Sequence, residues 1–193
     1  MDFTEGTWEE KNNRAKKMML WFGIGSLIMS FAGLTSAVVV SSKRPDWLSD
    51  FQLPEAFQIS TGIIILSSIS LIFARKALKA NKQKATTLWL LVTLVLGITF
   101  ISSQFVGFGQ IINSGYNFTG PTSNVTMSFV YIIAVAHILH VIAGLISLMV
   151  VIYNHFKQRY NATHMLGFEL SATFWHFVDI LWLFLFLFLY FFR

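Results

Sequence analysis

Five apolar runs, each long enough to cross a lipid bilayer as one helix, dominate this chain. We place them at residues 18–40, 57–75, 86–105, 125–153 and 167–192. Prolines, a Lys-rich stretch and glycines such as Gly107 and Gly109 separate the runs, as turn-forming residues do. Because helices satisfy their own backbone hydrogen bonds in lipid, we expect an all-α membrane protein. It would comprise an N-terminal arm at 1–17 and one five-helix transmembrane domain at 18–193.

Lysine and arginine predict the orientation of these helices. Eleven of the 14 Lys and Arg residues lie in the N-terminal arm and in the second and fourth connections. Only Lys43, Arg44 and Arg193 lie on the other side. Since cytoplasmic segments are enriched in positive charge, we expect a cytoplasmic N-terminus and a C-terminus outside.

Composition excludes several classes of function. The chain has no cysteine, so it can form neither disulfides nor cysteine-ligated metal or iron–sulfur sites. Its basic residues are dispersed between apolar runs and form no single patch, which argues against nucleic-acid binding. The connections are too short for a soluble domain, so we expect function within the membrane or through partners there.

The last apolar run carries polar residues that are costly in hydrocarbon. Asp179 lies near its midpoint, His176 one turn earlier, and Glu169 two further turns back on the same face. The fourth run carries His137 and His140, in line with Gly144 and Ser147. We therefore expect Glu169, His176 and Asp179 to tie the last run to the fourth through these histidines.

Small residues form a second pattern, because they mark close approach of helices in membranes. In the first run they recur at spacings of three and four, at Gly23, Ser26, Ser30, Gly33 and Ala37. This stripe predicts a helix–helix interface.

The same residues leave other readings open. His137, His140 and His176 could ligate haem between two helices, or a metal with Asp179, but no spacing fixes the geometry. Asp179 and Glu169 could belong to an ion or proton path. A site for lipid headgroups could lie at the cytoplasmic end, formed by Glu169, His164, His155 and Lys157. The same residues could equally belong to a solvated loop.

The last run also resembles a known family. Gly167-Phe168-Glu169, followed by the string from Trp175-His176-Phe177-Val178-Asp179 to Phe186, resembles the C-terminal signature of subunit III of haem–copper oxidases. The segment 137–144 is similar to that family's penultimate-helix motif, and His164 precedes Gly167 as a family histidine does. Weaker similarity extends over nearly the whole chain from Met18.

The resemblance implies the short, five-helix form of this subunit, in the cytoplasmic membrane of a bacterium. Such a subunit would hold no redox cofactor itself and would dock on the catalytic subunit I, which holds haem and copper, with subunits II and IV nearby. The bundle would be split by a cleft that holds phospholipids. Membership of a larger respiratory supercomplex stays open.

The resemblance further implies a function. The complex would be an aa3- or caa3-type cytochrome c oxidase, and this chain would stabilise it and support proton uptake during reduction of oxygen to water. Catalytic and metal-ligating residues would be absent from the chain. Lipid-binding and structural polar roles would fall to Glu169, His176, Asp179, His137, His140, His164 and Trp175.

Two departures and several alternatives accompany this interpretation. Leu27 and Gly107 stand where the family often has glutamates, so a proton-antenna role tied to those acids is in doubt. The alternatives are subunit III of a quinol oxidase, an accessory protein of nitric oxide reductase, a standalone haem-binding cytochrome and an independent transporter.

Overall fold

Five α-helices form the computed structural model of the chain, which describes residues 7–48, 53–116, 118, 124–160 and 165–192. They are α1 (Trp8–Ser41), α2 (Glu55–Lys79), α3 (Gln83–Asn113), α4 (Val125–Phe156) and α5 (Leu166–Phe191). Each is long and apolar enough to span a membrane, and the described residues contain no strand. The expectation of an all-α protein with five spans is confirmed.

Helix α1 begins further toward the N-terminus than its apolar run. Thr7 caps it: the Glu10 amide donates to Thr7 Oγ1 at 3.3 Å, and the Thr7 amide donates to Glu10 Oε2 at 2.9 Å. This reciprocal capping box satisfies two backbone amides and lets a helix start among charged residues. Residues 8–17 of the expected arm are therefore helical.

Helix α3 continues to Asn113, past the point where its glycines suggested a loop. Gly107 lies inside the helix and is buried. A Cβ atom at Gly107 would collide with the aromatic ring of Phe57 on α2. Gly107 thus serves close packing between two helices, which is a common use of glycine in membrane proteins.

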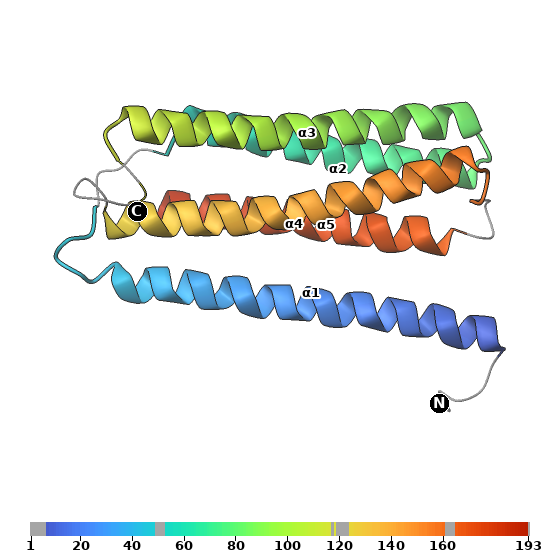
Figure 1. Cartoon of the computed structure of the whole chain (residues 1–193), viewed down its shortest axis with the longest axis horizontal. Coiled ribbons are helices and arrows are strands. Elements are labelled where there is room, and N and C mark those ends of the chain that lie inside the picture. Colours follow the sequence, from blue (N-terminus) through green and yellow to red (C-terminus); the bar gives the residue numbers. More distant parts are fainter. Residues whose placement is uncertain (1–6, 49–52, 117, 119–123, 161–164, 193) are drawn as a thin grey trace.

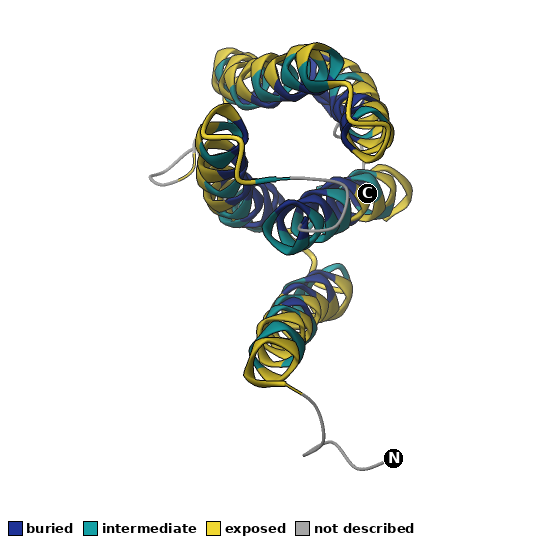
Figure 2. Cartoon of the chain, turned by 90° about the vertical axis from the view of Figure 1, so that its right-hand side faces the viewer, coloured by how far each residue is buried: buried dark blue, intermediate teal, exposed yellow. Residues whose placement is uncertain are grey.

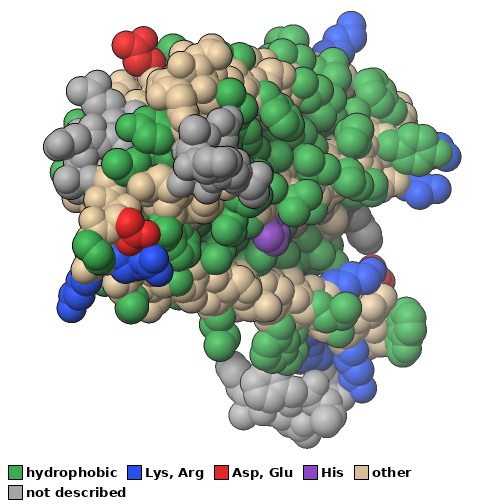
Figure 3. Space-filling model, turned by 60° about the vertical axis from the view of Figure 1, so that its left-hand side comes forward, with side chains coloured by type: hydrophobic (Ala, Val, Ile, Leu, Met, Phe, Trp, Pro, Cys, Tyr) green, Lys and Arg blue, Asp and Glu red, His purple; other side chains and the backbone are tan. Residues whose placement is uncertain are grey.

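Helices α2 to α5 surround a common core, and α1 lies to one side of them (Figures 1 and 2). Among the described residues, α1 contacts only α4 and α5. Buried residues face the interior of the four-helix group in the end-on view of Figure 2. In Figure 3, charged side chains lie toward the ends of the helices, and hydrophobic side chains cover the surface between them.

Trp175 on α5 occupies the centre of the core and is 1% exposed. A Cβ atom at Gly97 of α3 would lie 2.7 Å from Trp175 Cη2, and one at Gly144 of α4 would lie 3.0 Å from Trp175 Cε3. These two glycines allow three helices to close around one indole. The seam through Gly144 is therefore a true packing seam, as its spacing predicted.

The small-residue stripe of α1 does not pack within the chain. Gly23, Ser26, Ser30 and Gly33 are exposed, and nothing lies within 4 Å of a Cβ atom built on either glycine. Helix α1 instead buries Ile24, Phe31, Thr35 and Val38, which lie on a different face. The spacing correctly predicted that these small residues share one face of α1. No other helix of the chain packs against that face among the described residues.

Candidate functional site

The polar face of α5 meets α2 rather than α4. At one end of the seam, Arg75 Nη2 donates to Glu169 Oε1 at 2.7 Å, and both side chains are partly exposed. Two turns further on, His176 Nδ1 lies 2.5 Å from the Ser68 hydroxyl. The expected link from Glu169 and His176 to His137 and His140 was wrong, because the partners of both residues lie on α2.

Asp179 is the most deeply placed acid of this seam. It is 5% exposed, and neither carboxyl oxygen has a hydrogen-bond partner among the described residues. The Ser68 hydroxyl, which already binds His176, also lies within interaction range of this carboxyl. Ser68, His176 and Asp179 thus form a small polar cluster between α2 and α5, and Asp179 makes no hydrogen bond to His140.

His137 lies in an aromatic cage. It is fully buried, and neither ring nitrogen has a hydrogen-bond partner among the described residues. Its ring lies 4.9 Å from that of Trp182 on α5, with Phe31 and Phe100 edge-on. The ring contact with Trp182 joins α4 to α5, and the contacts with Phe31 and Phe100 join α4 to α1 and to α3.

His140 faces α1. Its Nδ1 atom lies 2.7 Å from the Ala136 carbonyl oxygen, and its ring packs edge-on against Phe31 at 5.7 Å. Among the described residues, no three histidines or acids come together in a way that could hold a metal ion. The three histidines proposed as possible ligands therefore have different polar partners: His137 has none among the described residues, His140 has a backbone carbonyl and His176 has a serine.

Indole and hydroxyl groups supply the remaining cross-links of the core. Trp175 Nε1 donates to Ser67 Oγ and Trp182 Nε1 to Thr61 Oγ1, each at 3.1 Å, so both tryptophans of α5 bind α2. Ser147 donates to Ser171 at 2.9 Å and joins α4 to α5. Trp175 is one of the residues for which we expect a structural polar role. The sequence does not indicate that Ser67 and Thr61 are the partners of the two tryptophans.

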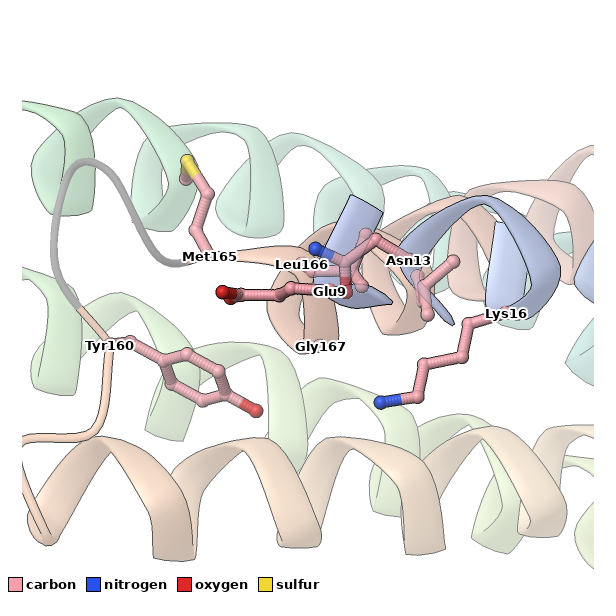
Figure 4. A pocket seen from close by; sticks show the side chains of 8 residues that line it. Glu9, Asn13, Lys16, Tyr160, Met165, Leu166 and Gly167 are labelled. Atoms are coloured by element: carbon pink, nitrogen blue, oxygen red, sulfur yellow. The ribbon is translucent and has the colours of Figure 1, made fainter. Parts of the chain in front are cut away.

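The residues expected to bind a headgroup do not gather. Glu169 pairs with α2, His155 is buried and bonds Thr87 on α3 at 2.9 Å, and the Lys157 ammonium lies over the Tyr153 ring. His164 lies outside the described residues. A different set lines an open cavity of about 360 Å³ at the same end of the molecule (Figure 4).

This cavity, which we call the α1–α5 cavity, lies between the N-terminal parts of both helices. Helix α1 contributes Glu9, Asn13 and Lys16, and the other wall comprises Tyr160 with residues 165–167 and 170. Sequence reasoning missed the contribution of α1, because the first apolar run begins only at residue 18 and predicts an arm at 1–17. The spacing of four and three between Glu9, Asn13 and Lys16 was the available signal, since it places them on one helix face.

Gly107 and Leu27, where the resemblance leads us to expect acids, have unequal surroundings. Gly107 faces the Phe57 ring. A larger side chain at this position would therefore require movement of α2 or α3. Leu27 on α1 is half-buried.

Comparison with known proteins identifies the family. The family model described as Cytochrome c oxidase subunit III matches residues 12–193. The chain is 33% identical to Cytochrome c oxidase subunit 3 of Spodoptera frugiperda over 141 residues, which are 72% of this chain and 89% of that protein. It is 27% identical to Cytochrome c oxidase subunit 3 of Bacillus sp. (strain PS3), over 93% of this chain and 86% of that protein.

A quinol oxidase subunit is also similar. Cytochrome bo(3) ubiquinol oxidase subunit 3 of Buchnera aphidicola is 32% identical over 134 residues, which are 68% of this chain and 66% of that protein. The fold is that of a multi-pass helical membrane protein whose buried polar groups mainly join helices. The chain belongs to the cytochrome c oxidase subunit III family, and hence to the subunits of an oxidoreductase complex that associate with other oxidase subunits.

Proposed function

We propose that this chain is a non-catalytic subunit of an aa3- or caa3-type cytochrome c oxidase in the cytoplasmic membrane of a bacterium. The observation that carries the proposal is the family match over residues 12–193. Its role is to stabilise the catalytic subunit I, with subunits II and IV as further partners. The polar groups of the core support a structural role, since several of them bind another helix of the same chain, as His176, Trp175 and Trp182 do.

The exposed stripe of α1 is the proposed docking face for a helix of the catalytic subunit. Glycine and serine let two backbones approach closely, whereas a purely lipid-facing helix needs no such side chains. Gly23 and Gly33 have open space at their Cβ positions, and the stripe continues through Ser26 and Ser30. This face is also free of the contacts that α1 makes with α4 and α5.

Phospholipid binding is the second part of the proposal. The α1–α5 cavity lies at the end that the charge distribution predicts to be cytoplasmic, where lipid headgroups meet the helices. It combines Lys16 with apolar side chains such as Leu166 and Leu170. A cavity between helices at this depth that includes a lysine suits a phosphate-bearing lipid.

Support of proton uptake by the complex is the third part. Because Leu27 and Gly107 replace the family acids, this support would depend on acids that the chain retains near the expected cytoplasmic end, such as Glu9 and Glu169. Asp179 is a further retained acid, but it lies deep in the bundle.

Purification through an affinity tag on this chain tests the proposal. We expect haem–copper subunits to co-purify, and cytochrome c to drive oxygen uptake by the isolated complex. The similarity to the bo(3) subunit favours one alternative, in which ubiquinol and not cytochrome c drives uptake. Recovery of the chain without any haem-bearing partner would contradict both versions.

A further inference from the structure

Helix α1 packs on the four-helix group through its C-terminal part only. Its buried side chains are Ile24, Phe31, Thr35 and Val38. No side chain of residues 8–23 is buried. Phe31 packs edge-on against the rings of His137 and His140 on α4, at centroid distances of 6.5 and 5.7 Å. The contacts that hold α1 in place therefore begin only at residue 24 and become dense from Phe31 onward.

The connection that follows α1 is fixed to the start of α4. The Leu48 amide donates to Thr126 Oγ1, and Asn124 Nδ2 donates to the Asp46 carbonyl oxygen, each at 3.0 Å. Trp47 adds a ring contact with the same helix. We call this pair of hydrogen bonds the anchor. It holds the C-terminal end of α1 close to α4.

Toward its N-terminus, α1 diverges from α4 and α5 in both ribbon views (Figures 1 and 2). The open α1–α5 cavity of about 360 Å³ lies between its N-terminal part and the start of α5. A helix that is packed near one end and borders an open cavity near the other can tilt about the packed part, as in hinge motions. At about 1.5 Å per residue, Lys11 lies about 36 Å from Thr35, whereas Val40 lies about 8 Å from it. The same tilt therefore moves Lys11 several times as far as Val40.

We propose that α1 is a hinged helix, whose N-terminal half swings about the packed residues between Phe31 and Val38 until docking of the chain in its complex locks it. The anchor keeps the C-terminal end of α1 in place during this motion. The swing lets the exposed stripe of small residues align with a partner helix whose tilt differs from that of α1. The locking step rests on the proposed function, in which this stripe meets the catalytic subunit, whereas the swing does not.

Spin labels on paired cysteines test the hinge, because the chain has no cysteine of its own. Lys11→Cys with Lys84→Cys joins the N-terminal part of α1 to one end of α3, and Val40→Cys with Asn113→Cys joins the C-terminal end of α1 to the other end of α3. All four side chains are exposed. Double electron–electron resonance on the full chain in lipid nanodiscs gives the distance distributions. From the ratio of the two lever arms, we expect the Lys11 pair to be at least about twofold wider than the Val40 pair.

A third pair shows whether the label on α3 causes the width. Lys84→Cys with Lys157→Cys joins α3 to the end of α4, and Lys157 is also exposed. Its distribution should be as narrow as that of the Val40 pair. Equal widths of the Lys11 and Val40 pairs, or a Lys157 pair as wide as the Lys11 pair, would overturn the hinge.

Thr126→Val tests the anchor, because it removes the acceptor of the Leu48 amide and keeps the size of the side chain. We expect it to widen the distribution of the Val40 pair. Ser128→Ala is the matched control on α4, since it removes a hydrogen bond to the Phe118 carbonyl instead. It should leave the Val40 pair unchanged. No effect of Thr126→Val, or an equal effect of Ser128→Ala, would overturn the role of the anchor.

The locking step is measured in the purified oxidase complex, with the complex of the unsubstituted chain as the background. The Lys11 pair should narrow there to the width of the Val40 pair. A Lys11 pair that stays wide in the complex overturns the locking step and the proposed docking face together, while the hinge of the free chain stands. A narrow Lys11 pair in the free chain overturns the hinge alone, because co-purification tests the proposed function separately.

Discussion

His176 Nδ1 on α5 lies 2.5 Å from the Ser68 hydroxyl on α2, so the histidine of the family-like motif joins these two helices. We predict a coupling between them in a double-mutant cycle of Ser68→Ala and His176→Phe. Hydrogen bonds between membrane helices contribute about 0.6 kcal/mol on average and up to about 1.7 kcal/mol. Unfolding of the purified chain in mixed micelles gives the four free energies that the cycle needs. A cycle of Ser68→Ala with Thr87→Val serves as the control and should be additive, and additivity of the first cycle would count against the contact.

Asp179 supports a different expectation. Its carboxyl oxygens make no hydrogen bond among the described residues, so Asp179→Asn removes none and keeps the shape of the side chain. The free energy of unfolding should change by less than about 1 kcal/mol. The same unfolding assay measures it. A loss of several kcal/mol would mean that the carboxyl has a partner which the described residues do not include.

The Arg75–Glu169 ion pair should contribute only modestly. Both side chains are partly exposed, at 46% and 30%, and exposed pairs contribute at most about 1 kcal/mol. Glu169→Gln should lower the unfolding free energy within that range, and the exchange Arg75→Glu with Glu169→Arg should recover part of the loss. Lys76→Gln, next to Arg75, is the control and should have no effect. Equal effects of Lys76→Gln and Arg75→Gln would show that general charge, and not this pair, matters.

Gly97 and Gly109 allow a matched comparison within α3. A Cβ atom at Gly97 would lie 2.7 Å from Trp175, so Gly97→Ala should destabilise the chain by about 1–3 kcal/mol through overpacking. Nothing lies within 4 Å of a Cβ atom at Gly109, and Gly109→Ala should be neutral or stabilising by up to about 1 kcal/mol. Thermal unfolding of the two variants gives the comparison. Similar melting temperatures would contradict the position assigned to Trp175.

Apolar run length predicted the number and type of helices, because only helices can satisfy the backbone in lipid without neighbours. It did not predict where helices end outside the hydrocarbon. The start of α1 depends on the Thr7–Glu10 capping box, a local polar feature that an apolar run does not include. Gly107 predicts a loop by its residue type, whereas in the structure it accommodates the Phe57 ring within a continuous helix.

The sequence was less able to predict which helix the polar face of α5 contacts. The spacing of Glu169, His176 and Asp179 correctly placed them on one face of α5, but a spacing does not state which helix that face meets. Arg75 and Ser68 lie about two turns apart on α2 and match Glu169 and His176 across the seam. The sequence around Ser67 and Ser68 contains no motif that points to a partner. Only the three-dimensional arrangement shows that these serines bind Trp175 and His176 on α5.

The most direct test of the account is the fate of the oxidase when the open face of α1 is filled. Gly23→Leu with Gly33→Leu leaves the chain's own core untouched, because nothing lies within 4 Å of a Cβ atom at either position. Ala32→Leu, exposed beside the stripe, is the control. We expect the double variant to be lost from the complex purified through the catalytic subunit, which should keep its initial oxygen uptake but inactivate in fewer turnovers. Full retention of the double variant, with an unchanged active lifetime of the oxidase, would contradict the account.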